Sequence, residues 1–246
     1  MSARMIRPVY LLALLALISA PMAFALGAPV SKPARTALSA VTPTEKPVRH
    51  YHEFFLYRIH EGPVGLLFLG DSITDIWPTR GQWSWLKFAK YDPADFGVSG
   101  DRTENVLWRI THGELDGIHP KVTVILIGTN NLGQLHDEKP EWVAAGIKKI
   151  VETVHEKLPE TKVLLLGVFP RGDQDSPYRS QIKTINSIIS KLDDGNKTRY
   201  LDIGNIFLGP DGDIPTENMP DKLHPSPKGY DLWYAAMKPT LDEMMK

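Results

Sequence analysis

Five short apolar stretches are the feature that most constrains the fold of this chain. They read as continuous apolar runs, without regular alternation of apolar and polar residues, and they cover residues 64–70, 94–98, 122–128, 162–168 and 199–203. Continuous runs of this length are typical of strands that are covered on both faces, as in a parallel sheet. The run at 94–98 is the weakest of the five. The pattern therefore predicts a parallel sheet.

Segments with helical spacing separate these runs and close the chain, at residues 104–110, 141–158, 180–192 and 229–245. In the second of them the apolar residues fall on one stripe of a helix, and Pro159 ends the pattern. The alternation of strands and helices predicts an α/β fold, a three-layer α/β/α sandwich around a five-stranded parallel sheet with right-handed crossovers. In such sheets, functional sites form at the carboxyl ends of the strands.

The composition excludes several classes of function. The chain has 246 residues, which suits one α/β domain. It carries 28 basic and 29 acidic residues, so nothing indicates a nucleic-acid partner. It has no cysteine, which excludes disulfides, thiolate metal ligands and a cysteine nucleophile. No His-Glu-x-x-His motif or comparable cluster occurs, so we expect no metal and no other cofactor.

The first 25 residues have the layout of a secretory signal peptide. Two arginines precede an apolar run at 9–18, and an Ala-Phe-Ala cleavage site follows at 23–25. The run is shorter than the roughly 20 apolar residues that a membrane-spanning helix needs. We therefore predict a signal peptide over 1–25 and an exported protein, periplasmic or secreted, with no stable membrane insertion. An uncleaved anchor that reaches Leu26 is the alternative.

Residues 26–50 differ in composition from the rest of the chain. They are rich in proline, alanine, serine and threonine and have no apolar period. Such a composition is typical of a flexible linker without a packed core. We therefore expect a linker over 26–50 and one folded domain over residues 51–246.

Polar residues follow the predicted strands at the edge where a site is expected. Ser72 follows the first strand, the glycine-rich segment 97–101 follows the second, and Asn130 follows the third. The long loop after the last strand holds Asp221 and His224. Acyl transfer needs groups of these kinds: a nucleophile, a base, a group that orients the base, and donors for an oxyanion.

Each of these residues also has an ordinary structural explanation. A serine, an aspartate or an asparagine can cap a helix or a turn, a glycine can serve a turn, and a histidine can lie in a surface loop. Their convergence on one edge favours a site. Ser99 is a poor alternative nucleophile, because Asp101 stands where the Gly-x-Ser-x-Gly elbow requires its second glycine.

The motifs at the strand ends resemble those of the SGNH (GDSL-type) hydrolases, whose name gives the Ser, Gly, Asn and His of four sequence blocks. The corresponding blocks lie at residues 70–72, 97–100, 128–130 and 221–224. The chain departs from the literal Gly-Asp-Ser-Leu motif only by Ile73 in place of leucine. The resemblance implies a flavodoxin-like SGNH hydrolase fold.

Within that family the likeness is strongest to the catalytic α subunits of platelet-activating-factor acetylhydrolase and their bacterial relatives. It runs through "FGVSGDRTENVLWRITHGELDGIHPKV" (96–122), "GTNN" (128–131) and "FPRG" (169–172), and covers roughly residues 64–241. The intracellular mammalian enzymes lack a signal peptide. This difference bears on the natural substrate of the chain and leaves its chemistry unaffected.

The resemblance implies a role for each site residue. Ser72 is expected to attack an ester carbonyl, His224 to act as general base, and Asp221 to orient the imidazole. The oxyanion hole is expected to comprise the N–H groups of Ser72 and Gly100 and the side-chain amide of Asn130. Gly100 is preferred to Gly97 because it occupies the last glycine of the second block. Asp71 is interpreted as a structural residue of the turn.

A small acyl pocket, also implied by the resemblance, predicts short-chain and mainly acetyl esters. An exported enzyme of this kind would act on an acetylated polysaccharide, glycan or lipid. The alternatives are a longer-acyl lipase, lysophospholipase or thioesterase on the same fold, and a non-catalytic module that binds an acetylated glycan or lipid. The resembled subunits form dimers, so a homodimer is also considered. Four tryptophans are candidates either for core packing or for contact with a sugar or lipid: Trp77, Trp83, Trp85 and Trp108.

Overall fold

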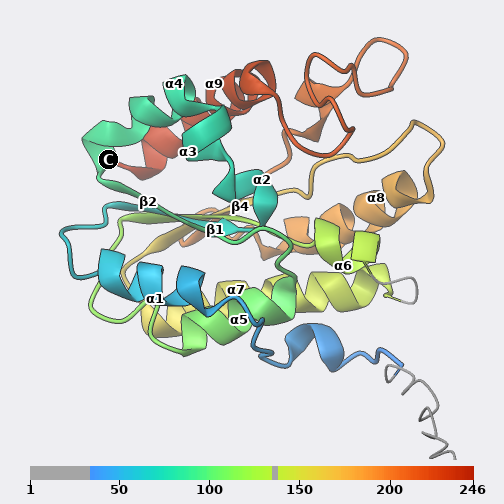
Figure 1. The fold of residues 1–246 in the computed structure, drawn as a ribbon. Helices are drawn as coiled ribbons and strands as arrows, with labels where there is room; N and C mark the ends of the chain where they lie inside the picture. Colours follow the sequence, from blue (N-terminus) through green and yellow to red (C-terminus); the bar gives the residue numbers. More distant parts are fainter. Residues whose placement is uncertain (1–33, 135–137) are drawn as a thin grey trace, which may run out of the picture. The chain divides into compact units, whose positions relative to one another are not determined.

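A five-stranded parallel sheet forms the centre of the fold (Figure 1). The computed structural model describes residues 34–134 and 138–246, so the predicted signal peptide lies outside the described residues. The strands lie in the order β2-β1-β3-β4-β5, and every neighbouring pair is parallel. Their bounds are β1 (Leu66–Gly70), β2 (Pro93–Gly97), β3 (Val122–Leu126), β4 (Lys162–Leu166) and β5 (Thr198–Leu201). Each strand overlaps one of the five predicted apolar runs, with at least one end that differs by one or more residues.

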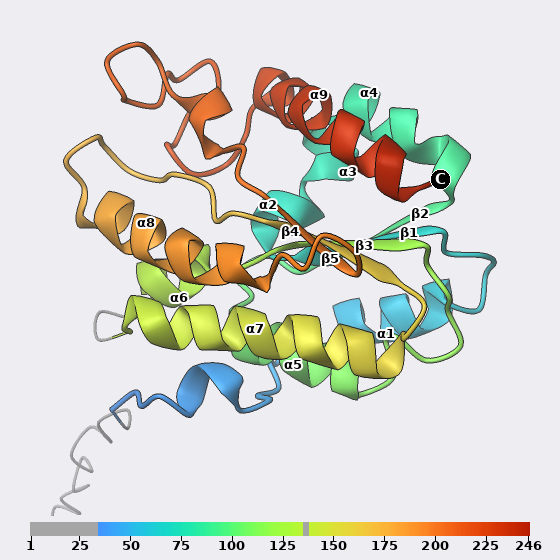
Figure 2. The same ribbon diagram turned by 180° about the vertical axis from the view of Figure 1, so that it is seen from behind.

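Helices cover both faces of the sheet, as Figures 1 and 2 show from opposite sides. The longer ones are α1 (Arg49–Arg58), α5 (Thr103–Thr111), α7 (Pro140–Lys157), α8 (Pro177–Ile189) and α9 (Pro227–Met244). The shorter ones are α2 (Ser72–Asp75), α3 (Trp77–Arg80), α4 (Gln82–Trp85) and α6 (Thr129–Gln134). Segments of 3₁₀ helix are η1 (Ser39–Val41), η2 (Leu86–Tyr91), η3 (Ser190–Leu192) and η4 (Gly204–Phe207).

Two apolar clusters fill the space between the sheet and its two helical layers. Successive residues of β1 alternate between them: Leu67 and Leu69 join the cluster under α1, α5, α7 and α8, whereas Leu66 and Phe68 join the cluster under α3 and α9. Because both faces of the strand are buried, its sequence is a continuous apolar run. The predicted three-layer α/β/α sandwich is confirmed.

The strand order places the functional edge of the sheet. The chain passes from β1 outward to β2 and then returns to the other side of β1 to form β3. The loops after β1 and β3 therefore leave the sheet side by side in opposite directions, and this is where ligand sites form in doubly wound folds. Ser72 begins α2 just after β1, and Asn130 lies in the first turn of α6 after β3.

The tryptophans divide between core and surface. Trp77 is fully buried, and its ring centroid lies 4.0 Å from that of Trp233. Trp85 and Trp108 are partly buried, whereas Trp83 is 72% exposed. Trp77 is therefore a core residue, and Trp83 is the most accessible of the four.

Residues 34–48, here called the N-terminal strap, differ from the flexible linker expected over residues 26–50. Ala40 is fully buried, and its carbonyl accepts a hydrogen bond of 2.9 Å from Thr103 Oγ1. Arg35 forms ion pairs with Glu104 at 2.9 Å and with Glu138 at 2.8 Å. Docking through backbone groups and single charges leaves no apolar period, so the sequence pattern did not indicate it.

No helix of the described residues is long and apolar enough to cross a membrane.

Asp95 in β2 carries a buried carboxyl group. Its Oδ1 accepts a hydrogen bond of 2.7 Å from the Gly97 N–H, while Oδ2 is buried without a partner among the described residues. Burial is the main cause that raises the pKa of Asp95 to about 7. The folded state therefore keeps a proton that the unfolded chain releases above about pH 4.

This proton predicts a pH-dependent effect of Asp95→Asn. Stability contributed by the protonated carboxyl is lost as pH rises from about 4 through about 7, whereas asparagine keeps the acceptor for Gly97 and cannot ionise. We expect the substitution to raise the free energy of unfolding by about 2 kcal/mol at pH 8 and by much less at pH 5, measured by urea unfolding. Equal effects at the two pH values would contradict the assignment.

Candidate active site

Ser72 stands at the start of α2, immediately after β1. Asp71 is the residue that caps this helix, because its Oδ1 accepts a hydrogen bond of 3.0 Å from the Ile73 N–H. The Ser72 hydroxyl is therefore free of the capping role that sequence alone left open. Its Oγ lies 2.9 Å from Nε2 of His224, although the two residues are 152 positions apart in the chain.

A second hydrogen bond extends this contact to Asp221. Nδ1 of His224 lies 2.6 Å from Oδ2 of Asp221, and Oδ1 of Asp221 accepts bonds from the N–H groups of Leu223 and His224 at 3.1 and 2.7 Å. Burial alone would raise the pKa of Asp221, but the hydrogen bonds from His224 and Leu223 lower it below its ordinary value. The carboxyl group is therefore ionised at neutral pH, beside the imidazole.

The loop that carries His224 is held against the serine turn by α9. Ser226 caps this helix through Gly229 at 3.1 Å, and Tyr230 on its first turn donates a hydrogen bond of 2.8 Å to the carbonyl of Ile73. Trp233, one turn later, packs on Trp77. Tyr230 and Trp233 thus both contact the segment that follows Ser72, and these contacts hold the start of α9 beside the serine turn.

Asn130 lies in the first turn of α6, after β3, and is almost fully buried. Its Nδ2 donates a hydrogen bond of 3.0 Å to the carbonyl of Asp101. An amide nitrogen carries two hydrogens, so this bond fixes the side chain and leaves one hydrogen for another acceptor. Arg171 supports the same turn by donating to the carbonyl of Thr129 at 2.9 Å.

Gly97 ends β2 and Gly100 lies in the loop after it, and glycine is favoured at the two positions for different reasons. A Cβ at Gly97 would collide with the backbone nitrogen of Asp75, so close packing of β2 on α2 requires glycine there. Gly100 has φ +79°, in the left-handed region that favours glycine. Within the described residues its N–H donates to no other group.

A buried ionic cluster supports the loop of Gly100, and sequence reasoning missed it. Arg109 of α5 is only 4% exposed. It donates to Asp101 Oδ2 at 2.9 Å and to the Phe96 carbonyl at 3.0 Å, and it also pairs with Glu114. The quoted segment 96–122 contains all of these residues, but their partners are set by the packing of α5 on the sheet.

Asp71 is buried beneath the serine turn, in agreement with its structural interpretation. It is 1% exposed, and burial is the main cause that raises its pKa to about 7. Its Oδ2 has no hydrogen-bond partner among the described residues. The neutral acid is therefore favoured below about pH 7, and among the described residues the hydrogen bonds of His224 go to Ser72 and Asp221.

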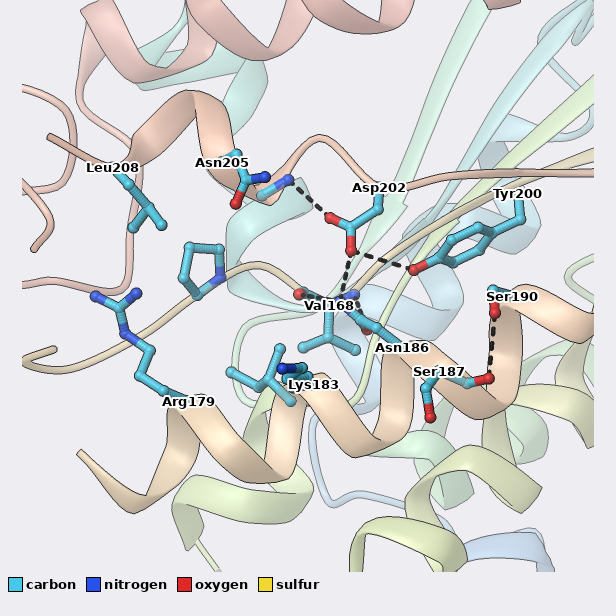
Figure 3. Close-up of a pocket in the computed structure, with 13 residues that line it drawn as sticks. Val168, Arg179, Lys183, Asn186, Ser187, Ser190, Tyr200, Asp202, Asn205 and Leu208 are labelled. Carbon is cyan, nitrogen blue, oxygen red and sulfur yellow. Dashed lines mark hydrogen bonds between the residues drawn. The ribbon is translucent and has the colours of Figure 1, made fainter. Parts of the chain in front are cut away.

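The cavity drawn in Figure 3 lies apart from these side chains. It has a volume of about 580 Å³ and is lined by α8, the ends of β4 and β5, and η4, with Lys183 and Asn205 at its wall. Ser72 and His224 do not line it. No group of three or more histidine, aspartate or glutamate side chains able to hold a metal ion occurs in the described part of the chain.

Comparison with known proteins identifies the family. The profile of the GDSL-like lipase/acylhydrolase family matches residues 68–232, about two thirds of the chain. The chain belongs to this family. It is thus a carboxylic ester hydrolase, and the predicted SGNH (GDSL-type) identity is confirmed.

Relatives of this GDSL-like hydrolase include subunits of an acetylhydrolase. The chain is 37% identical over 166 residues to platelet-activating factor acetylhydrolase IB subunit alpha1 of Bos taurus, an alignment that covers 67% of this chain and 69% of the subunit. It is 35% identical over 180 residues to subunit alpha2 of Rattus norvegicus, covering 73% and 76% of the two chains.

Solved structures share the fold of this GDSL-like hydrolase at low sequence identity. A putative platelet activating factor from Streptococcus pneumonia superposes with a TM-score of 0.67 at 20% identity, covering 78% of this chain and 92% of the other. A catalytic mutant of an acetylxylan esterase from Geobacillus stearothermophilus gives a TM-score of 0.58 at 18% identity, covering 75% and 96%.

Proposed function

We propose that this hydrolase cleaves short-chain carboxylic esters, acetyl esters above all, with Ser72 as nucleophile. The observation that carries the proposal is the continuous chain of hydrogen bonds from Ser72 Oγ through His224 to Asp221. A serine hydroxyl becomes a useful nucleophile only beside a base, and the base needs a partner that fixes its tautomer. All three parts are in contact here.

The hydrogen bonds of His224 support one path for the protons in the proposed reaction. With Nδ1–H directed to the Asp221 carboxylate, Nε2 of His224 carries the lone pair that accepts the Ser72 proton. Ser72 Oγ then bonds to the ester carbonyl carbon. The bond from that carbon to the alcohol oxygen breaks as the imidazolium gives its proton to this oxygen, which leaves an acyl-serine and a free alcohol. In the second half-reaction water bonds to the acyl carbon while His224 takes the water proton, and the bond from the carbon to Oγ breaks as this proton returns to Ser72, so that the acid is released. Asp221 stabilises the imidazolium and stays ionised throughout.

Three donors are proposed for the oxyanion: the N–H groups of Ser72 and Gly100 and the free hydrogen of the Asn130 amide. The Gly100 N–H has no competing acceptor among the described residues, and the Asn130 side chain is held in place by Asp101. Fixed donors of this kind need no reorganisation when charge develops on the carbonyl oxygen.

Support for acetyl esters comes from the relatives. Subunits at 34–37% identity are named as an acetylhydrolase, and a structural neighbour is named as an acetylxylan esterase. Together with the proposed export of the chain, this favours an acetylated polysaccharide, glycan or lipid as natural substrate. A homodimer stays a prediction.

Hydrolysis of p-nitrophenyl esters tests this function. We expect the purified protein to release nitrophenol from the acetate ester, with activity falling as the acyl chain lengthens, and Ser72→Ala to reduce kcat by about 10⁴-fold or more. Highest activity at eight or more carbons would favour the lipase or thioesterase alternative. Retained activity in the variant would exclude Ser72 as nucleophile, and an inactive parent protein that binds acetylated glycan would favour the binding module.

The oxyanion role of Asn130 has its own test. We expect Asn130→Ala to lower kcat by about 100-fold while KM changes by less than about threefold, because the amide interacts with the transition state more than with bound ester. Asn205→Ala, at the exposed amide in the separate cavity of Figure 3, is the control and should leave both constants unchanged. A loss confined to KM would remove Asn130 from the oxyanion hole.

A further inference from the structure

We propose that Lys46 of the N-terminal strap is a positioning residue of the oxyanion hole. Its ammonium group orients and polarises the peptide that joins Ser99 to Gly100, and this peptide supplies one of the three donors. The proposal rests on the proposed function, since it assigns a role in the same hole. It concerns a residue outside the stretch 68–232 that defines the family.

The contact that carries the proposal lies within one peptide unit. Lys46 Nζ donates a hydrogen bond to the carbonyl oxygen of Ser99. That carbonyl and the Gly100 N–H belong to the same planar trans peptide, and they point in opposite directions. Lys46 therefore holds the carbonyl end and leaves the N–H end accessible to an oxyanion. A cation on the carbonyl also makes the N–H a stronger donor, because hydrogen bonds through a peptide polarise one another.

Other contacts hold the neighbouring groups but not this carbonyl. The carboxylate of Asp75 accepts hydrogen bonds from the N–H and the hydroxyl of Ser99. The Gly100 carbonyl accepts a hydrogen bond of 3.4 Å from Gln134 Nε2. The Asp101 carbonyl accepts one from the Asn130 amide. Within the described residues, Lys46 is the donor to the Ser99 carbonyl. The orientation of the Ser99–Gly100 peptide thus depends on the strap.

Lys46 is held in place by a second contact of its ammonium group and by hydrogen bonds of the nearby strap backbone. The ammonium group also lies 3.4 Å from Asp101 Oδ1, and the side chain is only 25% exposed. Two residues earlier, the Thr44 N–H donates to the Glu104 carbonyl at 2.9 Å, and the Thr44 carbonyl accepts from Asn105 Nδ2 at 3.0 Å. Anchoring of the backbone reduces the conformational entropy that a free lysine would lose on forming the contact.

A purely structural role is the competing explanation, in which Lys46 only fastens the strap to the domain. The two explanations differ in what they change. Loss of a fastening lowers stability and leaves the chemical step alone once the protein is folded. Loss of peptide orientation lowers kcat at constant KM, because the N–H donates to the oxyanion more strongly than to the bound ester.

Three variants separate these explanations in p-nitrophenyl acetate hydrolysis. Lys46→Met keeps the aliphatic part of the side chain and removes the charge, whereas Lys46→Arg keeps a cationic donor. Lys149→Met is the control, because it removes a charge from an exposed lysine of α7 whose side chain has no partner in the described chain. Removing one whole donor costs about 10²–10³-fold in kcat. Because Lys46→Met only weakens one donor, we expect it to lower kcat by about tenfold and to change KM by less than about twofold. Lys46→Arg should recover kcat to within about threefold of the parent, and Lys149→Met should match the parent.

Affinity for phenylboronic acid gives a second readout, because its serine adduct places an anionic oxygen in the hole. We expect Lys46→Met to weaken this affinity by about the same factor as kcat. An unchanged kcat, or a loss of kcat that tracks a lower melting temperature without recovery by Lys46→Arg, would overturn the proposal. If the parent protein itself lacks activity that depends on Ser72, the proposed function fails instead, and the two failures are thereby distinguished.

Discussion

The hydrogen bond between Ser72 Oγ and His224 Nε2 is the contact on which the candidate site depends. It joins the turn after the first strand to the loop before the last helix, 152 residues later. The two segments lie far apart in the chain, so other contacts must bring them together. The contact exists because α9 packs its aromatic residues Tyr230 and Trp233 against the segment that follows Ser72. A core interaction thus holds the loop that carries Asp221 and His224 next to Ser72.

Ion pairs support the loop that contains Gly100. Arg109 is buried between Asp101 and Glu114, where breaking one partner would leave an uncompensated charge in a dry interior. This requirement holds Asp101 in place, next to Gly100, which supplies a proposed donor. Apolar packing therefore positions Ser72 and His224, the proposed nucleophile and base, whereas ion pairs support the loop of the proposed donor Gly100. In our proposal Lys46 also polarises the Ser99–Gly100 peptide, so the N-terminal strap belongs to the charged contacts that support this loop.

Sequence patterns predicted the sheet and the convergence of the candidate site residues on one edge of it. The run at 64–70 is apolar throughout because Leu66 and Leu67 face different layers and both are buried. Ser72, Asn130 and His224 were found because the carboxyl ends of parallel strands share one edge. Their catalytic roles stay predictions that the proposed variants test.

Other parts of the structure could not be predicted from these patterns. Ala40 and Lys46 dock through a carbonyl and an ammonium group, which leave no periodic trace in the sequence. The partners of Arg109 depend on the placement of α5 against the sheet, and thus on tertiary packing. Helix α1 was missed because its sequence, "RHYHEFFLYR", is mostly polar and aromatic with no clear apolar stripe.

Covalent labelling of the intact protein by a fluorophosphonate tests the central claim most directly, because the reagent reports an activated serine without reference to any natural substrate. We predict one phosphonyl adduct per chain, located on Ser72 by peptide mass spectrometry, and labelling slower by about 100-fold or more in His224→Asn, which removes the base. An adduct on another residue, or an equal labelling rate in the two proteins, would contradict the account.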